Sequence, residues 1–510
     1  MFKMFRKLPM IVILGSTGTG KTKLSIELAE RYCGEIISAD SMQVYANLDI
    51  ATAKATKEEQ SRAKHHLLDV ATPAEPYTVT HFRNAALPII ENLLAHSKCP
   101  IVVGGTNYYI ESLLWDILVD TKAAAAATTT IADGKCLATS STSDATMSEN
   151  LKNIKYLTDD EMSATTSELL HKHLQTIDPE AANRFHPNNK RKIMRAIEVF
   201  QQSGQTLSAK LKEQRQQPGG NRLGGPLRFP HTILFWLRCN QDVLNTRLDK
   251  RVDAMLEQGL LREIRAFHNE HKCDKSNADN PYTKGVLQTI GFKEFIPYLE
   301  QFNAANDQKI EEYLRANAYK MPTEEHFKSN NKEINKNNKS SVNDPTNSNN
   351  NENNETLPPG LELLSACLNE LKLVTKRYSK KQIKWINNRF LATKERQVPN
   401  IYELDTSDVS IWNEAVLQRA TTVIDCYRSD LVCEIEHMPK RVHPGEGLNE
   451  ESSHFCDICE RHFIGEYQYK LHQISNKHKR RLEGKRKLLK KTEKNLNEVS
   501  TNLNDNFNKL

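Results

Sequence analysis

The chain has 510 residues, a formal net charge of +6 and an apolar share of only 38%. This length predicts about three domains, or a large enzyme core with an appendage, and the low apolar share indicates that part of the chain is not core. No apolar run reaches the roughly 18 residues of a membrane-spanning helix, and ten cysteines are too few for a disulfide scaffold, so both of these classes are excluded. The first ten residues are basic and acid-free, which leaves a targeting segment as an open alternative.

Strand-like and helix-like segments alternate along the chain. The expected strands are 10–14, 35–38, 100–103 and 232–237, and the expected helices between them include 21–31, 82–96 and 241–257. Such alternation predicts a parallel α/β sheet with right-handed crossovers. Residues 168–201 have helical periodicity with no strand nearby, which predicts a helical insertion on that sheet.

Two polar stretches interrupt this pattern. Residues 121–149 are rich in Ala, Thr and Ser, and residues 329–356 are an Asn, Lys and Ser tract. Neither stretch has enough apolar side chains to offset the conformational entropy that ordering would cost. We expect both to be disordered insertions within a folded body.

A phosphate-binding loop follows the first expected strand. It has the pattern G-x-x-x-x-G-K-[ST] and opens an expected helix, the context in which this pattern binds phosphates. The loop comprises Gly15, Ser16, Thr17, Gly18, Thr19, Gly20, Lys21 and Thr22. Backbone N–H groups, the helix N-terminus, the Lys21 ammonium and the Thr22 hydroxyl would hold a di- or triphosphate and its Mg²⁺. The alternative is a glycine-rich turn without a ligand.

One carboxylate lies where the phosphates would bind. A nucleotide hydrolase would end an apolar strand in Asp, but the strand 100–103 leads into Gly104, Gly105 and Thr106. Instead, Asp40 follows the strand 35–38, so it should lie at a strand C-terminus near the phosphate loop. Asp40 could also simply cap a turn.

A zinc-finger pattern lies near the C-terminus. Cys456-x₂-Cys459-x₁₂-His472-x₅-His478 has the ligand spacing of one structural Zn²⁺ site. A basic run over 477–494 follows, with ten Lys or Arg and two Glu. Such a run is typical of nucleic-acid binding, with a nuclear localisation signal or a solvated helix as alternatives.

Several separated segments together resemble the tRNA dimethylallyltransferases, also called tRNA isopentenyltransferases. The resemblance extends over about residues 10–390, and a C-terminal zinc finger is what eukaryotic members carry. The segments are Gly15–Thr22, Ser38–Tyr45, Asp49–Lys54, His65–Val70, Val102–Tyr109, His186–Phe200, Arg247–Leu260 and Gln288–Glu294. The expected fold is an α/β P-loop parallel-sheet core with a helical insertion domain and a C-terminal ββα zinc finger.

The resemblance implies an enzyme and its reaction. Dimethylallyl diphosphate would donate its five-carbon group to N6 of the adenosine 3′ to the anticodon, tRNA position 37, giving N6-isopentenyladenosine and diphosphate. The phosphate loop would hold the donor rather than ATP. Asp40 matches the family's general base, while Lys21, Thr22, Arg251 and Mg²⁺ would stabilise the leaving diphosphate.

The resemblance also implies a set of tRNA contacts. Lys192 stands where the family often has Arg, so the resemblance supports a tRNA contact less strongly for Lys192 than for Arg195. The basic run that contains Lys381 could equally be a solvated face. The expected contacts are Asp40, Ser41, Met42, Gln43, Thr106, Lys192, Arg195, Lys381 and Gln382. We interpret the finger as a tRNA-affinity module outside the catalytic site.

The expected domain organisation follows from these segments. The core begins at 1–112 and resumes at 216–440, the helical insertion is 113–215, the zinc finger is 452–482 and the basic tail is 483–510. We expect a monomer without a membrane partner, in the cytoplasm, the mitochondrion or both, with the nucleus as an alternative.

Two other functions are weighed against the tRNA enzyme. An adenylate isopentenyltransferase, acting on free AMP, ADP or ATP, shares the phosphate loop and the Asp but needs no finger or basic tail. A non-enzymatic nucleic-acid-binding P-loop protein or zinc-finger regulator would leave Asp40, Gln43 and Tyr45 without a role.

Overall fold

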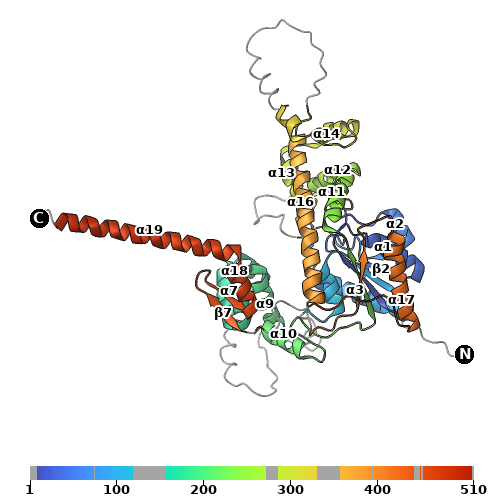
Figure 1. Ribbon diagram of the computed structural model, residues 1–510, viewed down its shortest axis with the longest axis horizontal. Coiled ribbons are helices and arrows are strands. Elements are labelled where there is room, and N and C mark those ends of the chain that lie inside the picture. The colour runs from blue at the N-terminus through green and yellow to red at the C-terminus, as the bar shows by residue number, and fades with distance from the viewer. Residues whose placement is uncertain are drawn as a thin grey trace, which may run out of the picture. The chain divides into compact units, whose positions relative to one another are not determined.

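The structure is a computed structural model in which the chain forms two compact units (Figure 1). Unit 1 comprises Met1–Asp116, Leu227–Thr393 and Gln397–Lys440, and unit 2 comprises Ile117–Pro226, Lys394–Arg396 and Arg441–Leu510. The residues described are 8–73, 75–118, 156–271, 285–329, 357–392, 395–441, 448 and 452–507. The polar stretch 121–149, residues 330–356 of the second polar stretch and the first seven residues of the chain lie outside them.

A six-stranded parallel sheet forms the centre of unit 1. Its strand order is β3-β2-β4-β1-β5-β6, so the strand that precedes the phosphate loop lies inside the sheet. The strands are β1 (Met10–Gly15), β2 (Glu35–Ser38), β3 (His65–His66), β4 (Pro100–Val103), β5 (Thr232–Arg238) and β6 (Ile401–Asp405). The expected parallel α/β core is therefore confirmed.

Apolar composition explains which strands could be predicted. Every residue of β1 is buried, as expected for a parallel strand covered on both faces. The two edge strands were not predicted. β3 has only two residues, and β6 is half polar.

Helices cover the sheet and extend beyond it. α1 (Lys21–Tyr32) and α17 (Arg419–Ser429) pack on one face, where Leu24, Leu28 and Ile424 join strand residues such as Ile13. Further helices of unit 1 include α2 (Lys57–Arg62), α3 (Val79–Ala95), α4 (Asn107–Leu114), α11 (Gln241–Glu257), α12 (Leu260–Glu270), α13 (Ile296–Gln301), α14 (Ala304–Ala316) and α16 (Leu361–Ile386). Short 3₁₀ turns η3 (Gly285–Gln288) and η4 (Lys293–Phe295) and π-helical turns η5 (Asn387–Leu391) and η6 (Asn413–Gln418) complete the unit.

The long helix α16 links a second hydrophobic core to the site. Near its start, Leu364, Leu368 and Leu371 pack with α12, α13 and α14. Further along, the buried residues become polar, with Ser379 and Gln382. Buried polar groups need partners, and the partners of Gln382 lie in the functional site described below.

Unit 2 combines the helical segment with the zinc finger. Its helices α6 (Asp159–Ala164), α7 (Ser167–Ile177), α8 (Pro179–Arg184) and α9 (Lys190–Ser203) enclose a small core, and α10 (Leu207–Gln216) follows. The finger consists of β7 (Ser453–Cys456), β8 (Arg461–Ile464) and α18 (Glu466–Ile474), with α19 (Asn476–Phe507) after it. β8 packs against α8, so finger and helices belong to the same compact unit.

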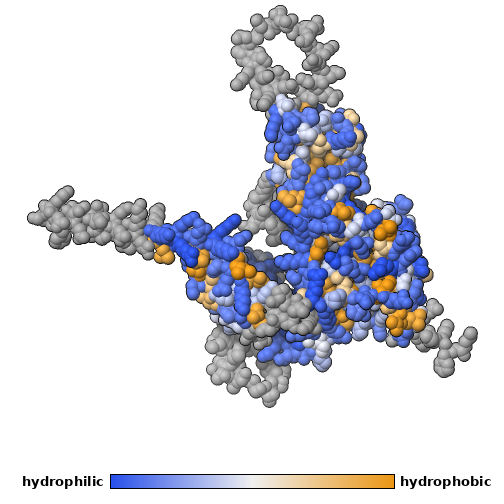
Figure 2. All heavy atoms as spheres, in the orientation of Figure 1, coloured by the Kyte–Doolittle hydropathy of each residue, from blue (hydrophilic) through white to orange (hydrophobic). Residues whose placement is uncertain are grey.

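Hydrophilic residues dominate the visible surface, including the described start of α19 (Figure 2). Among the described residues, no helix combines the length and the apolar character needed to cross a bilayer.

A buried ion pair holds the second core of unit 1 together. Arg265 of α12 contacts Asp307 of α14 through two hydrogen bonds of 2.6 and 3.0 Å, and the Tyr298 hydroxyl donates to the same carboxylate at 2.6 Å. Asp307→Ala leaves a buried guanidinium without its counter-charge. The variant should lower the free energy of unfolding of unit 1 by about 3–5 kcal/mol in urea denaturation.

The matched control removes an exposed pair instead. Glu30 and Arg62 lie 2.8 Å apart at the surface, where solvent screens the attraction. Glu30→Ala should leave the unfolding midpoint unchanged. A similar midpoint for Asp307→Ala and the wild type would contradict the stabilising role of the buried pair.

Candidate active site and zinc centre

A cavity of about 860 Å³ lies in unit 1. Its lining includes the phosphate loop after β1, the segment after β2 and the glycines after β4. These strands are parallel, so their carboxyl ends meet at one edge of the sheet, where ligands of α/β proteins bind. The helices α11 and α16 contribute further wall residues such as Arg251 and Gln382, and the segments 49–60 and 288–293 also line the cavity.

The phosphate loop has the geometry of an anion site. Gly18 and Gly20 adopt positive φ angles of 84° and 83°, which turn the backbone into the N-terminus of α1. The Lys21 ammonium donates to the carbonyl oxygen of Ser16 at 2.7 Å, which folds the side chain back over the loop. Loop and helix N-terminus together provide converging N–H groups and positive charge for a phosphate chain.

Lys21 is electrostatically perturbed in this cavity. Burial lowers its pKa to about 8, the negative charge of Asp40 opposes the shift, and the positive charge of Arg251 adds to it. Burial likewise lowers the pKa of Arg251, again opposed by Asp40. Two cations and one carboxylate therefore share the site, and an anionic ligand would be stabilised by both cations.

The structure places Asp40 where the sequence predicted it. The residue follows β2 and lines the cavity, and its charge acts on Lys21 of the phosphate loop. Its Oδ1 accepts from the backbone N–H of Met42 at 3.0 Å, the turn contact of the alternative interpretation. Oδ2 lies toward Gly105, where an added Cβ would come within 3.2 Å of it. One oxygen thus orients the side chain while the other faces a glycine of the cavity wall.

The residues after Asp40 are hydrogen-bonded to the surrounding loops. The Thr106 hydroxyl accepts from the Ser41 backbone N–H at 2.9 Å and donates to the Ser41 hydroxyl at 3.1 Å. The Gln43 amide accepts from Ser38 at 3.0 Å and donates to the carbonyls of Thr52 and Ala53, both at 3.2 Å. The Gln43 side chain is therefore already hydrogen-bonded within the protein.

Met42 makes a contact with a later segment of unit 1. Its sulfur accepts from the Thr289 hydroxyl at 3.0 Å, and both residues line the cavity.

The two arginines of α11 have different surroundings. Arg251 lines the cavity with the phosphate loop. Arg247, one turn earlier, donates to the backbone carbonyls of Thr406 and Ser407 at 2.6 and 2.9 Å. Arg251 therefore contributes its guanidinium to the cavity, whereas Arg247 binds the backbone of the 406–407 segment.

Tyr378 and Gln382, two of the cavity residues of helix α16, stand one turn apart. Gln382 accepts from the backbone N–H of Thr17 at 2.9 Å and donates to the Gly105 carbonyl at 2.9 Å, so it joins the phosphate loop to the segment after β4. Burial raises the pKa of Tyr378, whose hydroxyl hydrogen-bonds with Thr106 and Gln382. Sequence reasoning missed Tyr378. The available signal was a polar i, i+4 pair within an otherwise apolar helix face.

The remaining residues expected to contact tRNA lie on two helices. Lys381 is exposed on α16 of unit 1. Lys192 and Arg195 lie on α9 of unit 2, where Lys192 is exposed with its ammonium 5.9 Å from the centroid of the Phe185 ring. Arg195 pairs with Glu198 at 3.3 Å.

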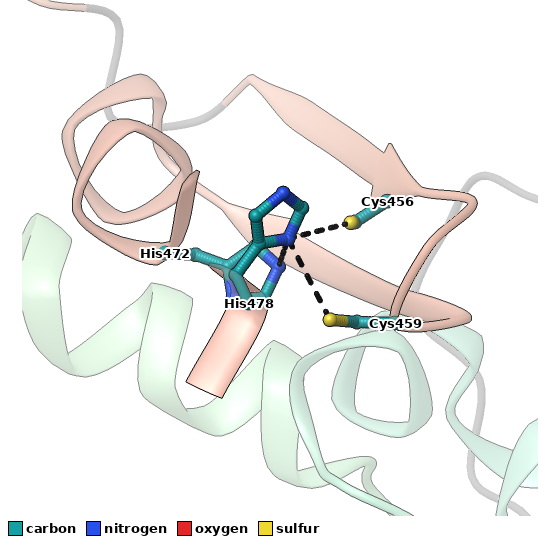
Figure 3. A group of neighbouring side chains, drawn as sticks. All are labelled: Cys456, Cys459, His472 and His478. Carbon is teal, nitrogen blue, oxygen red and sulfur yellow. Dashed lines mark hydrogen bonds between the residues drawn. The ribbon is translucent and has the colours of Figure 1, made fainter. Parts of the chain in front are cut away.

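Four side chains of the finger converge on one point (Figure 3). The ligand atoms of Cys456, Cys459, His472 and His478 all lie within 4.8 Å of one another. His478 Nδ1 is 3.6 Å from each cysteine sulfur and 3.1 Å from His472 Nε2. Zn–S and Zn–N bonds of about 2.3 and 2.0 Å at tetrahedral angles put sulfur and nitrogen about 3.5 Å apart, close to the observed separation. The predicted ligand set therefore fits Zn²⁺.

Comparisons with known proteins agree with this combination of features. The model of the family described as IPP transferase matches residues 43–321, more than half of the chain. The chain belongs to this family. A second model, described as isopentenyl transferase, matches residues 8–75, and one described as a zinc-finger double-stranded RNA-binding domain matches residues 453–479.

Relatives of this IPP transferase cover most of its length. A tRNA dimethylallyltransferase of Mus musculus is 38% identical over 95% of this chain and 88% of its own. One of Saccharomyces cerevisiae is 29% identical over 93% and 92%. A crystal structure of a eukaryotic dimethylallyltransferase acting on tRNA is similar with a TM-score of 0.64 and 26% identity, over 95% of this chain and 99% of that one. Similarity over 93–95% of the chain favours the tRNA enzymes over both alternative functions.

The shifted pKa of Lys21 predicts that donor binding depends on pH. A bound diphosphate stabilises the protonated ammonium, so affinity should be highest below pH 8 and fall as Lys21 loses its proton above it. The dissociation constant of dimethylallyl diphosphate, measured at pH 7, 8 and 9, should rise with pH. In Lys21→Arg the group stays charged, and the rise should disappear. Equal pH dependence in the two proteins would contradict the assignment.

Zinc should be lost when one ligand is removed. Cys456→Ser leaves three ligands, so metal analysis of the purified variant should show a loss of about one zinc per chain. Cys33→Ser is the control, because Cys33 is an exposed free cysteine of unit 1 and should leave the zinc content unchanged. Full zinc content in Cys456→Ser would contradict the proposed ligand set.

Proposed function

We propose that this protein transfers a dimethylallyl group from dimethylallyl diphosphate to N6 of the adenosine at position 37 of tRNA. The observation that carries the proposal is the cavity that brings Asp40, Lys21 and Arg251 together at the end of the phosphate loop. Membership of the IPP transferase family supports the donor, and the names of the relatives support tRNA as acceptor.

The phosphate loop and two cations suit the leaving group. When the bond from the dimethylallyl carbon to the diphosphate oxygen breaks, negative charge grows on the diphosphate. Lys21 and Arg251 would stabilise that charge more strongly in the transition state than in the ground state, which is the requirement for catalysis. The departing diphosphate takes the bonding electron pair.

Asp40 suits the role of general base. The adenine amine is a weak nucleophile because its lone pair is delocalised into the ring. As N6 forms its bond to the dimethylallyl carbon, the Asp40 carboxylate accepts one amine proton and prevents positive charge from accumulating on nitrogen. The adenosine must leave the anticodon-loop stack to reach the cavity, at a cost of a few kcal/mol.

The cavity also suits Mg²⁺. This ion prefers oxygen ligands, and the Thr22 hydroxyl belongs to a residue that lines the cavity beside the expected diphosphate. When bound, Mg²⁺ would neutralise part of the diphosphate charge.

Unit 2 has surface features that suit the binding of tRNA, the proposed acceptor. The finger and the first turns of α19 carry exposed basic residues, including Lys479, Arg480 and Arg486. RNA phosphates bind to such clusters. We therefore expect Cys456→Ser to raise the dissociation constant of tRNA while leaving that of the donor unchanged.

The function is tested with purified protein, labelled dimethylallyl diphosphate and Mg²⁺. The acceptors are an unmodified anticodon stem-loop and free AMP. Label in the RNA supports the proposal, label in AMP alone contradicts the acceptor, and no transfer to either contradicts the donor.

Asp40→Asn tests the base. The isosteric amide can still accept the Met42 N–H bond but cannot take the amine proton. The turnover number should fall about 10²–10⁴-fold, with tRNA binding unchanged. Turnover of Asp40→Asn at the wild-type rate would contradict the role of Asp40 as general base.

A further inference from the structure

The indole of Trp412 packs against the phosphate loop. Trp412 is only 6% exposed, and a Cβ added to Gly20 would lie 2.8 Å from two carbons of its ring. The ring nitrogen donates to Glu27 at 2.9 Å, and the Lys23 ammonium lies 4.6 Å from a ring centroid. Gly20 and Lys23 line the cavity, whereas Trp412 is not among the described residues that do. The ring therefore supports the loop from outside the cavity.

The segment that carries Trp412 is itself anchored. We call residues 406–412, between β6 and η6, the strap. Its start is held by the two hydrogen bonds from Arg247 to the carbonyls of Thr406 and Ser407. A further bond of 2.7 Å joins the Thr406 N–H to the carbonyl of Arg238 at the end of β5. The strap is thus fixed to α11 and to the sheet before it reaches Gly20.

Helix α11 supports the loop in two places. Leu248 packs directly against it, since a Cβ on Gly18 would come within 2.9 Å of the leucine side chain. Through Arg247, the same helix holds the strap and hence Trp412 against Gly20. Arg251, one turn after Arg247, lines the cavity. One helix therefore sets the positions of the loop and of a cation that faces the same ligand.

The loop needs such support for a physical reason. The loop lies at the positive N-terminal end of α1 beside the two cations Lys21 and Arg251, so positive charge accumulates around it when no anion is bound. Glycines allow the shape of the loop but do not favour it over other backbone conformations. Ordering the loop only when the donor arrives would reduce affinity, because the entropy cost would be subtracted from the binding free energy.

We propose that Trp412 and Arg247 are positioning residues for donor binding, which act by holding Gly20 and the phosphate loop in the anion-binding conformation. The proposal concerns the donor half of the reaction. It predicts an effect on dimethylallyl diphosphate without an effect on tRNA.

The test compares Trp412→Ala with Trp412→Phe. In Trp412→Ala the KM for dimethylallyl diphosphate should rise about tenfold, with kcat at saturating donor within about twofold of the wild type and the Kd of tRNA unchanged. Trp412→Phe keeps a ring against Gly20 and should restore most of the donor affinity. Inorganic diphosphate, as a competitor, should show the same order of affinities, because it carries no dimethylallyl group.

Arg247→Lys provides an independent second variant. A lysine cannot make the two forked bonds to Thr406 and Ser407, so it should raise the donor KM as Trp412→Ala does. The donor KM of the double variant should be no higher than that of the more impaired single variant, because both substitutions act through the strap. Ile411→Ala is the control, because Ile411 is 47% exposed on the strap beside Trp412 and should leave the donor KM unchanged.

Three outcomes would overturn the proposal. These are a wild-type donor KM in both Trp412→Ala and Arg247→Lys, a Trp412→Phe variant as impaired as Trp412→Ala, and an equal rise in the Kd of tRNA. The last result would mean that the strap maintains the whole unit rather than the loop. If Trp412→Ala does not fold, Arg247→Lys and Trp412→Phe decide the question.

Discussion

The site depends on one carboxylate that lies among cations. Asp40 acts electrostatically on both Lys21 and Arg251, and these two cations face the same cavity. Without the carboxylate, two buried cations would repel each other with little solvent to screen them. With it, one negative charge offsets part of the positive charge of the two cations. The residue proposed as general base therefore also reduces the repulsion between the two cations.

The parallel sheet positions only part of this site, and helices position the rest. β1 and β2 deliver the phosphate loop and Asp40 to one edge. Gln382 of α16 then joins Thr17 of the phosphate loop to Gly105 of the segment after β4. α11 adds Arg251 from a third direction. Helices distant in sequence thus determine how far apart the loops stand.

The division into two units separates two physical tasks. Unit 1 encloses a cavity in which burial strengthens electrostatic interactions, as prenyl transfer requires. Unit 2 contains the zinc centre and exposed basic helices, as RNA binding requires. The finger packs on α8, so its fold, which depends on metal, is coupled to the helical segment. Zinc therefore stabilises part of a larger unit rather than an isolated finger.

The sequence by itself determined the features that depend on residues close along the chain. The phosphate loop, the central strands, the position of Asp40 after β2 and the four zinc ligands follow from local spacing, because a turn, a strand or a finger sets its geometry within a few residues. The bonds of Gln382, the place of Tyr378 and the packing of Trp412 on Gly20 were decided only by the tertiary structure. These contacts join residues separated by more than two hundred positions, and no local periodicity reports which distant surface a side chain will meet. The two arginines of α11 show the same limit, because their spacing places them on one helix face but only packing sends one to the cavity and the other to the strap.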